Sequence, residues 1–180
     1  MFPARFLVLA VAEDEYAEFR IRQLHMIKLI IRELSYCHEI DFRSHDIKAD
    51  IGRISGLYQI LSIEKLEDEA QYICEISKQE YIDLIGETES CMNKERYWKA
   101  HTILENIWNI EKGDRKLCFQ AIIWLLASLV HYQMGEPETA ERMYIKARER
   151  LHNLGYVEIV NQLGMKFSYP CFLELSSLVP

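Results

Sequence analysis

The stretch YWKAHTILENIW, residues 97–108, decides how the carboxy-terminal part of this 180-residue chain is interpreted. At about 100° per residue its apolar side chains cover an unusually wide arc of a helix, and only a narrow strip is polar. His101 and Glu105 lie one turn apart within the apolar arc, between Trp108 on one side and Trp98 on the other. The pattern predicts a helix that is packed on most sides, with a polar pair buried in the packing.

The next helix offers a polar partner for this pair. A short connection indicates that the helices predicted over residues 95–110 and 115–134 run antiparallel. Counting outward from that connection puts Gln120 level with Glu105. We therefore expect a polar cluster that joins these two side chains to His101, since a buried group left unpaired would cost about 1–3 kcal/mol.

Further polar and aromatic residues surround this cluster, namely Glu95, Trp98, Trp108 and His131. His131 falls near the level of Glu95, about 10 Å along the helix axis from His101. That separation argues against two histidines sharing one metal ion. A buried His–Glu pair in a helical bundle is usually a hydrogen-bonded part of the core. Ligand or metal binding and acid–base catalysis are the two other interpretations.

From residue 64 onward the sequence pattern predicts helices and no strands. Glycine and proline separate the helices, and Pro137 suits the first turn of one of them. Helices are predicted over residues 65–77, 79–93, 95–110, 115–134 and 136–153. A short helix near 157–163 and an apolar tail from Pro170 follow, and so apolar a tail should dock on a protein surface.

The amino-terminal part predicts a small α/β module. Apolar runs indicate strands and helices by their spacing. The strands are expected at residues 5–11, 39–43 and 57–63, and the helices at 13–36 and 46–54. The predicted fold class is therefore mainly α: a β-α-β-α-β module over residues 1–63, followed by a helical bundle domain over 64–180.

Composition and charge exclude several classes of protein. The chain is 49% hydrophobic and 27% charged, its net charge is −7, and its basic residues form no cluster that would suit phosphates. The apolar runs are too short for a membrane span or a signal peptide. We therefore expect a cytoplasmic protein that binds neither nucleic acid nor membrane. The abundance of Ile, Glu and Lys fits a thermophilic source, and AT-rich coding would give the same bias.

The cysteines and glycines carry no recognisable catalytic motif. The five cysteines, Cys37, Cys74, Cys91, Cys118 and Cys171, form no CxxC pair. Zinc sites and redox dithiols use such pairs, so mostly buried thiols and no metal site are expected. A glycine-rich phosphate loop and a GxSxG elbow are also missing from the sequence. No cofactor can therefore be named.

The stretch at residues 97–108 resembles a family known only as domain of unknown function 309. The most specific part is AHxxLExxW, and the matching positions are Tyr97, Trp98, Ala100, His101, Leu104, Glu105, Trp108, Gln120, Ile123, His131, Gly135 and Ala140. The resemblance covers residues 75–153. Lys99 and Thr102 stand where the family pattern has acids, so a metal site that used those acids would be incomplete here.

We expect a non-enzymatic binding or interaction protein that forms a homodimer. The reason is that a wide apolar surface and an apolar tail occur without a specific catalytic motif. The alternative is a small metal- or ligand-dependent, hydrolase-like enzyme that uses His101 and Glu105. Solvent access separates the two, because a catalytic imidazole has to open onto solvent or a pocket.

Overall fold

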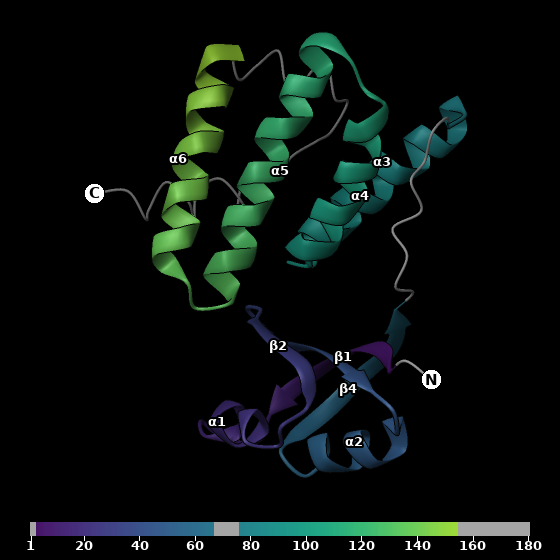
Figure 1. Ribbon diagram of the computed structural model, residues 1–180, viewed down its shortest axis with the longest axis vertical. Helices are drawn as coiled ribbons and strands as arrows, with labels where there is room; N and C mark the ends of the chain where they lie inside the picture. Colours follow the sequence, from purple (N-terminus) through teal and green to yellow (C-terminus); the bar gives the residue numbers. More distant parts are fainter. Residues whose placement is uncertain (1–2, 67–75, 155–180) are drawn as a thin grey trace. The chain divides into compact units, whose positions relative to one another are not determined.

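The computed structural model describes residues 3–66 and 76–154, which fall into two compact units. The first unit lies within Met1–Ala70 and the second within Gln71–Pro180. Six helices and one four-stranded sheet make up the described residues (Figure 1). The predicted fold class is therefore confirmed in its coarse form: a mainly helical protein with a small amino-terminal α/β part.

The first unit is an antiparallel sheet with two helices. Its elements are β1 (Ala4–Ala12), α1 (Ala17–Arg22), β2 (Ile27–Glu33), β3 (His38–Ser44), α2 (Ile47–Ile54) and β4 (Tyr58–Leu66). The strand order is β2-β3-β1-β4, and every neighbouring pair is antiparallel. Two β-α-β halves are thus interleaved, which is the split arrangement of ferredoxin-like folds.

Most of the predicted strands and helices of this unit are present, but the predicted order of elements along the chain is incomplete. The predicted strands correspond to β1, β3 and β4, and the predicted short helix corresponds to α2, which Asp46 caps by accepting a hydrogen bond from the Ala49 amide. An additional strand, β2, lies between α1 and β3. The predicted β-α-β-α-β order is therefore corrected to β-α-β-β-α-β.

The helix predicted over residues 13–36 is wrong because two elements share its apolar pattern. The helix ends at Arg22, and β2 begins at Ile27. The segment IKLIIRE is rich in isoleucine, which favours strands, although the same apolar residues can also be drawn on a helix face. His25 and Lys28 adopt left-handed backbone angles, with φ of 50° and 51°, which interrupts a continuous helix.

The core of this unit lies between its helices and one face of the sheet. Alternate residues of a strand point to the same face, and one set from each strand meets the helices. The buried cluster consists of Val8, Ala10, Ala17, Ile21, Ile31, Ile40, Phe42, Ile54 and Tyr58. The other set of strand residues, which includes Glu39 and Asp41, therefore lies on the opposite face of the sheet.

The second unit is helical throughout its described residues. It contains α3 (Lys78–Asn93), α4 (Tyr97–Ile110), α5 (Gly113–Gln133) and α6 (Pro137–Leu154), which confirms the helices predicted over 79–93, 95–110, 115–134 and 136–153. Successive helices pack against each other, so that α5 lies between α4 and α6 (Figure 1). None of the described helices is long and apolar enough to cross a membrane.

The remaining predicted segments fall at the margins of the described residues. The helix predicted over 65–77 begins wrongly, because Lys65 and Leu66 still pair with β1 in the sheet. Residues 67–75 lie outside the described residues. The short helix predicted near 157–163 and the apolar tail from Pro170 lie outside them as well.

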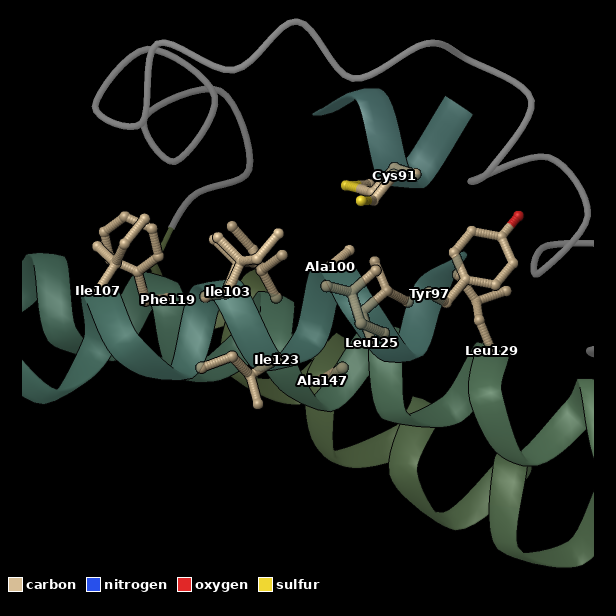
Figure 2. Packing of buried hydrophobic residues seen from close by; sticks show 14 of the residues in the cluster. Cys91, Tyr97, Ala100, Ile103, Ile107, Phe119, Ile123, Leu125, Leu129 and Ala147 are labelled. Carbon is tan, nitrogen blue, oxygen red and sulfur yellow. The ribbon is translucent and has the colours of Figure 1, made fainter. Parts of the chain in front are cut away.

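A continuous apolar core joins the four helices of the second unit. In Figure 2, Ala100, Ile103 and Ile107 of α4 lie beside Phe119 and other residues of α5. Cys91 of α3 and Cys118 of α5 belong to the same cluster as reduced, buried thiols, and burial raises the pKa of Cys91. Cys37 is a reduced, buried thiol in the first unit, whereas Cys74 and Cys171 lie outside the described residues.

One polar atom in the first core has no partner. The Tyr58 side chain is almost fully buried, and its hydroxyl makes no hydrogen bond among the described residues. The ring of His38 stands edge-on to it, with 5.6 Å between the centroids. Burial raises the pKa of Tyr58 to about 12, so the group is a neutral phenol. A buried hydroxyl of this kind costs stability.

We predict that Tyr58→Phe leaves the free energy of unfolding unchanged or raises it by up to about 2 kcal/mol, because it removes the unpaired hydroxyl and keeps the ring. Urea denaturation measures the effect. Phe42→Ala in the same core is the control and should cost about 3–5 kcal/mol. A loss above about 1 kcal/mol in Tyr58→Phe would show that the hydroxyl has a stabilising partner.

Candidate functional site

The predicted His–Glu pair lies at the edge of the packed side of α4. The buried residues of α4 are Tyr97, Ala100, Ile103, Leu104 and Ile107. The side chain of His101 is 26% exposed and that of Glu105 is 52% exposed. The expectation that both are buried is therefore wrong for Glu105, and His101 is accessible to solvent.

The two side chains form a loose ion pair. His101 Nδ1 lies 3.5 Å from Glu105 Oε2, one helical turn away. A charge-assisted hydrogen bond between such atoms would be shorter, at about 2.7–2.9 Å. Exposed pairs of this kind contribute little to stability, typically about 0–1 kcal/mol. The pair is consequently a surface feature whose hydrogen-bonding capacity is not consumed by the fold.

Three influences set the protonation of His101. Burial lowers the pKa of His101, the Glu105 carboxylate raises it, and the charge of His131 lowers it. Burial dominates, so the imidazole is neutral near neutral pH. His131 is on α5, and its influence shows that the two imidazoles are within electrostatic reach across the α4–α5 pair.

Gln120, the third residue of the predicted cluster, makes no bond to the other two. It lies half-buried on α5. Across residues 3–66 and 76–154, no hydrogen bond or ion pair involves its amide. The structure therefore joins His101 to Glu105 but does not join either to Gln120.

The polar candidates nevertheless share one surface. On α5 the partly or fully exposed residues Leu117, Gln120, Trp124, Ala127 and His131 follow one another at alternating intervals of three and four. Residues at those intervals lie in one row along a helix. We call this row, together with His101, Glu105 and Trp108 of α4, the α4–α5 strip.

Cations cover the two tryptophans of the strip. Lys116 Nζ lies 4.2 Å from the ring centroid of Trp108, and the Arg150 guanidinium carbon lies 5.5 Å from that of Trp124. Such contacts contribute about 0.5–1 kcal/mol at exposed sites. Lys116 thereby connects α4 to α5, and Arg150 connects α5 to α6, so both rings are held in place between neighbouring helices.

A second His–Glu contact lies at the carboxy-terminal end of α5, where the strip ends. His131 Nδ1 lies 2.8 Å from Glu136 Oε2. The Glu136 amide also donates to the His131 carbonyl, and Gly135 between them has a φ of 73°, which glycine adopts without strain. The turn therefore places an acidic side chain at the carboxy-terminal end of α5, on the same side as His131.

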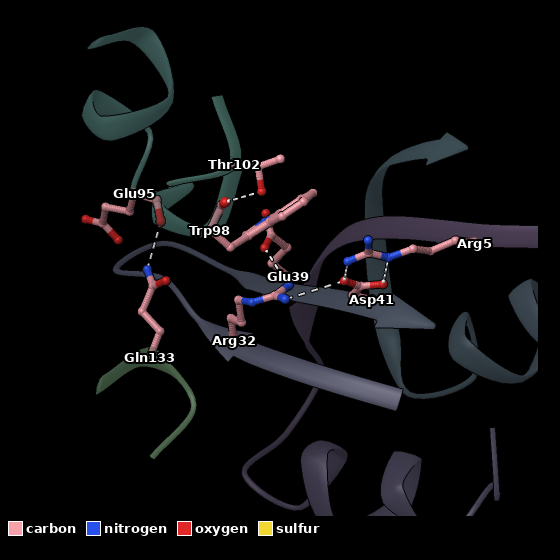
Figure 3. A network of polar contacts seen from close by, with 8 residues as sticks. All are labelled: Arg5, Arg32, Glu39, Asp41, Glu95, Trp98, Thr102 and Gln133. Atoms are coloured by element: carbon pink, nitrogen blue, oxygen red, sulfur yellow. Dashed lines mark hydrogen bonds and ion pairs between the residues drawn. The ribbon is translucent and has the colours of Figure 1, made fainter. Parts of the chain in front are cut away.

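Glu95 and Trp98, the outer predicted residues on the α4 side, contribute through their carbonyls. The Gln133 side-chain amide donates to the Glu95 carbonyl at 2.8 Å, and the Thr102 hydroxyl donates to the Trp98 carbonyl at 3.1 Å (Figure 3). Glu95 has a φ of 56° in the turn between α3 and α4. These contacts shape the start of α4.

The sequence did not predict a charged network on the face of the sheet opposite its two helices. Arg32 donates to Glu39 at 3.0 Å and to Asp41 at 3.4 Å, and Arg5 forms a two-pronged contact with Asp41 (Figure 3). Arg32, Glu39 and Asp41 are all buried. Two cations balance two carboxylates, which is typical of a structural network. The sequence pattern that could have indicated this network is the alternation of charged and apolar residues in HEIDFR.

The geometry limits what the residues could hold. Within the described part of the chain, no three His, Cys, Asp or Glu side chains cluster so that they could hold a metal ion. The imidazoles and the carboxylates of the strip can instead donate and accept hydrogen bonds at the surface, next to aromatic rings. The protein thus consists of two units: a ferredoxin-like unit and a helical unit that carries a polar–aromatic strip.

The helical unit matches a known family over part of its length. The family is described as domain of unknown function (DUF309), and its model matches residues 87–143. This match confirms the resemblance inferred from AHxxLExxW. It runs from the end of α3 into α6 and contains every residue of the α4–α5 strip. No curated protein and no solved structure shows significant similarity to the chain.

We predict opposite shifts of the His101 pKa in two variants. Glu105→Ala should lower it further, because the carboxylate that favours the charged ring is gone, and His131→Gln should raise it, because a repelling charge is gone. Titration of the imidazole resonances by NMR measures both. Glu105→Ala should also change the free energy of unfolding by less than about 1 kcal/mol. Shifts in the same direction, or a much larger loss of stability, would contradict this geometry.

Proposed function

We propose that the protein is a non-enzymatic binding or interaction protein that works as a homodimer and offers the α4–α5 strip to a partner. The observation that carries the proposal is where the family-matched residues lie. His101, Glu105 and Gln120 are at or near the surface, although their neighbours in sequence form the core. A cluster that served only the core would be buried and bonded.

The chemistry of the strip supports binding. The amide of Gln120 and the carboxylate of Glu105 retain hydrogen-bonding capacity that a partner can use. Tryptophan is enriched among the residues that dominate protein–protein interfaces. Because Lys116 and Arg150 hold the two rings of the strip in place, little side-chain entropy is lost on binding.

The net charge of the chain limits which classes of partner it can bind. A net charge of −7 without a basic cluster disfavours nucleic acid and anionic membrane surfaces. Lys116 and Arg150 are stacked on tryptophans, and the carboxylates of Glu105 and Glu136 lie beside His101 and His131. The proposed partner is therefore a protein, and the proposed location is the cytoplasm.

A hydrolase-like enzyme is the second candidate, favoured by the protonation of His101. A neutral, solvent-accessible imidazole next to a carboxylate has the properties of a general base. Elemental analysis of the purified protein and a panel of model esters and phosphate esters test this role. A turnover that disappears in His101→Ala would favour the enzyme over the binding protein.

For the binding protein we predict a dimer in solution. Sedimentation equilibrium should give twice the 21.3 kDa mass of the chain, with a dissociation into monomers on dilution. The model substrates should show no turnover that depends on His101. A mass of 21.3 kDa at every concentration would contradict the homodimer.

A further inference from the structure

One row of exposed and half-buried residues on α5 has the spacing of a helix-pairing seam. Leu117, Gln120, Trp124, Ala127 and His131 are separated by three, four, three and four residues. This is the alternation of the a and d positions that face a partner helix in a coiled coil. The opposite side of α5 is buried, including Ile122, Leu126 and Leu129. The helix thus has one seam used by its own core and a second one facing outward.

The flanking helices leave this second seam open to a partner. α4 and α6 are the described helices that pack extensively against α5, one on each side. The row between them contains an exposed Leu117 and a small residue, Ala127. A small side chain lets another helix approach closely, since interaxial distances of about 8–10 Å depend on the residues at the contact.

The seam is complementary to itself when two copies run antiparallel. In antiparallel pairing an a position of one helix faces a d position of the other, which sets Trp124 against the partner's Ala127. The same register sets Gln120 against the partner's His131. Large meets small in the first pair, and an amide meets an imidazole in the second, so both pairs are complementary in shape or hydrogen bonding.

The same register also matches the charges at the two ends. It brings Lys116, at the beginning of α5, level with the partner's Gly135 and therefore beside the partner's Glu136, just past the end of its α5. Glu136 is 46% exposed on its side chain and lies beside His131. A two-fold axis produces this contact twice, because an isologous interface repeats every pair. Opposite charges across an interface favour the correct register and disfavour others.

We infer that a second copy of this chain occupies the α4–α5 strip, with the two α5 helices antiparallel and Trp124 packed on the partner's Ala127. This inference rests on the proposed function and specifies its partner surface. His101 and Glu105 flank the seam on α4 and would line the edge of the interface. Gln120, which has no bonding partner among the described residues, gains one in the dimer.

Sedimentation equilibrium on the full chain tests the register through a charge swap. Lys116→Glu and Glu136→Lys should each weaken the dimer by about tenfold or more, since each places like charges together twice. The double variant should recover most of that loss. Ala127→Phe should abolish the dimer by filling the space for Trp124. Ile145→Glu, on an exposed position of α6 outside the seam, is the matched control and should dimerise like the wild type.

Circular dichroism of each variant confirms that the helices are intact before its mass is interpreted. A dimer that is unchanged by Ala127→Phe, or a double variant weaker than both single variants, would overturn the inference and leave a homodimer through another surface. A wild-type protein that is monomeric at all concentrations would overturn the homodimer itself. The two failures are therefore distinguishable.

Discussion

The second unit depends on how α5 is enclosed. This helix carries apolar residues around most of its circumference, so it can lie between α4 and α6 and contribute Phe119, Ile122 and Leu126 to one core. Between these two flanks, one row of α5 stays exposed or half-buried along its outer side. Because α4 borders that row, its tryptophan-flanked His101 and Glu105 lie along the same surface. The position of the strip is thus a consequence of packing, and its chemistry can serve binding without weakening the core.

Sequence patterns predicted the helical unit well because its helices are long, apolar and separated by glycine or proline. Gly135 and Pro137 bracket the turn between α5 and α6, as expected of such residues. The first unit was harder. IKLII suits a strand and a helix face equally, so only pairing with β3 decides that it forms β2. The buried network of Arg32 with Glu39 and Asp41 likewise depends on strand register, which no local pattern specifies.

For the candidate site, the sequence likewise predicted which residues are involved but not how deeply each is buried. The sequence identified His101, Glu105 and Gln120 as the polar exceptions on two apolar helices and placed them at neighbouring levels. The wide apolar arc around His101 and Glu105, which includes Trp98 and Trp108, predicts burial that the structure does not have at Glu105. Tryptophan often lies at the margin of a core, with one edge in contact with water or a cation, as Trp108 does beneath Lys116. Which side of α5 faced outward followed only from the packing of α4 and α6.

The central claim is that the α4–α5 strip is a surface that a partner covers and not part of the core. Chemical labelling of His101 and His131 with diethyl pyrocarbonate, read by mass spectrometry over a dilution series, tests it most directly. We expect both imidazoles to react in the folded, dilute protein and to become protected as the protein concentration rises. Protection at every concentration until the protein unfolds would contradict it, because it would mean that these residues are sealed inside the fold.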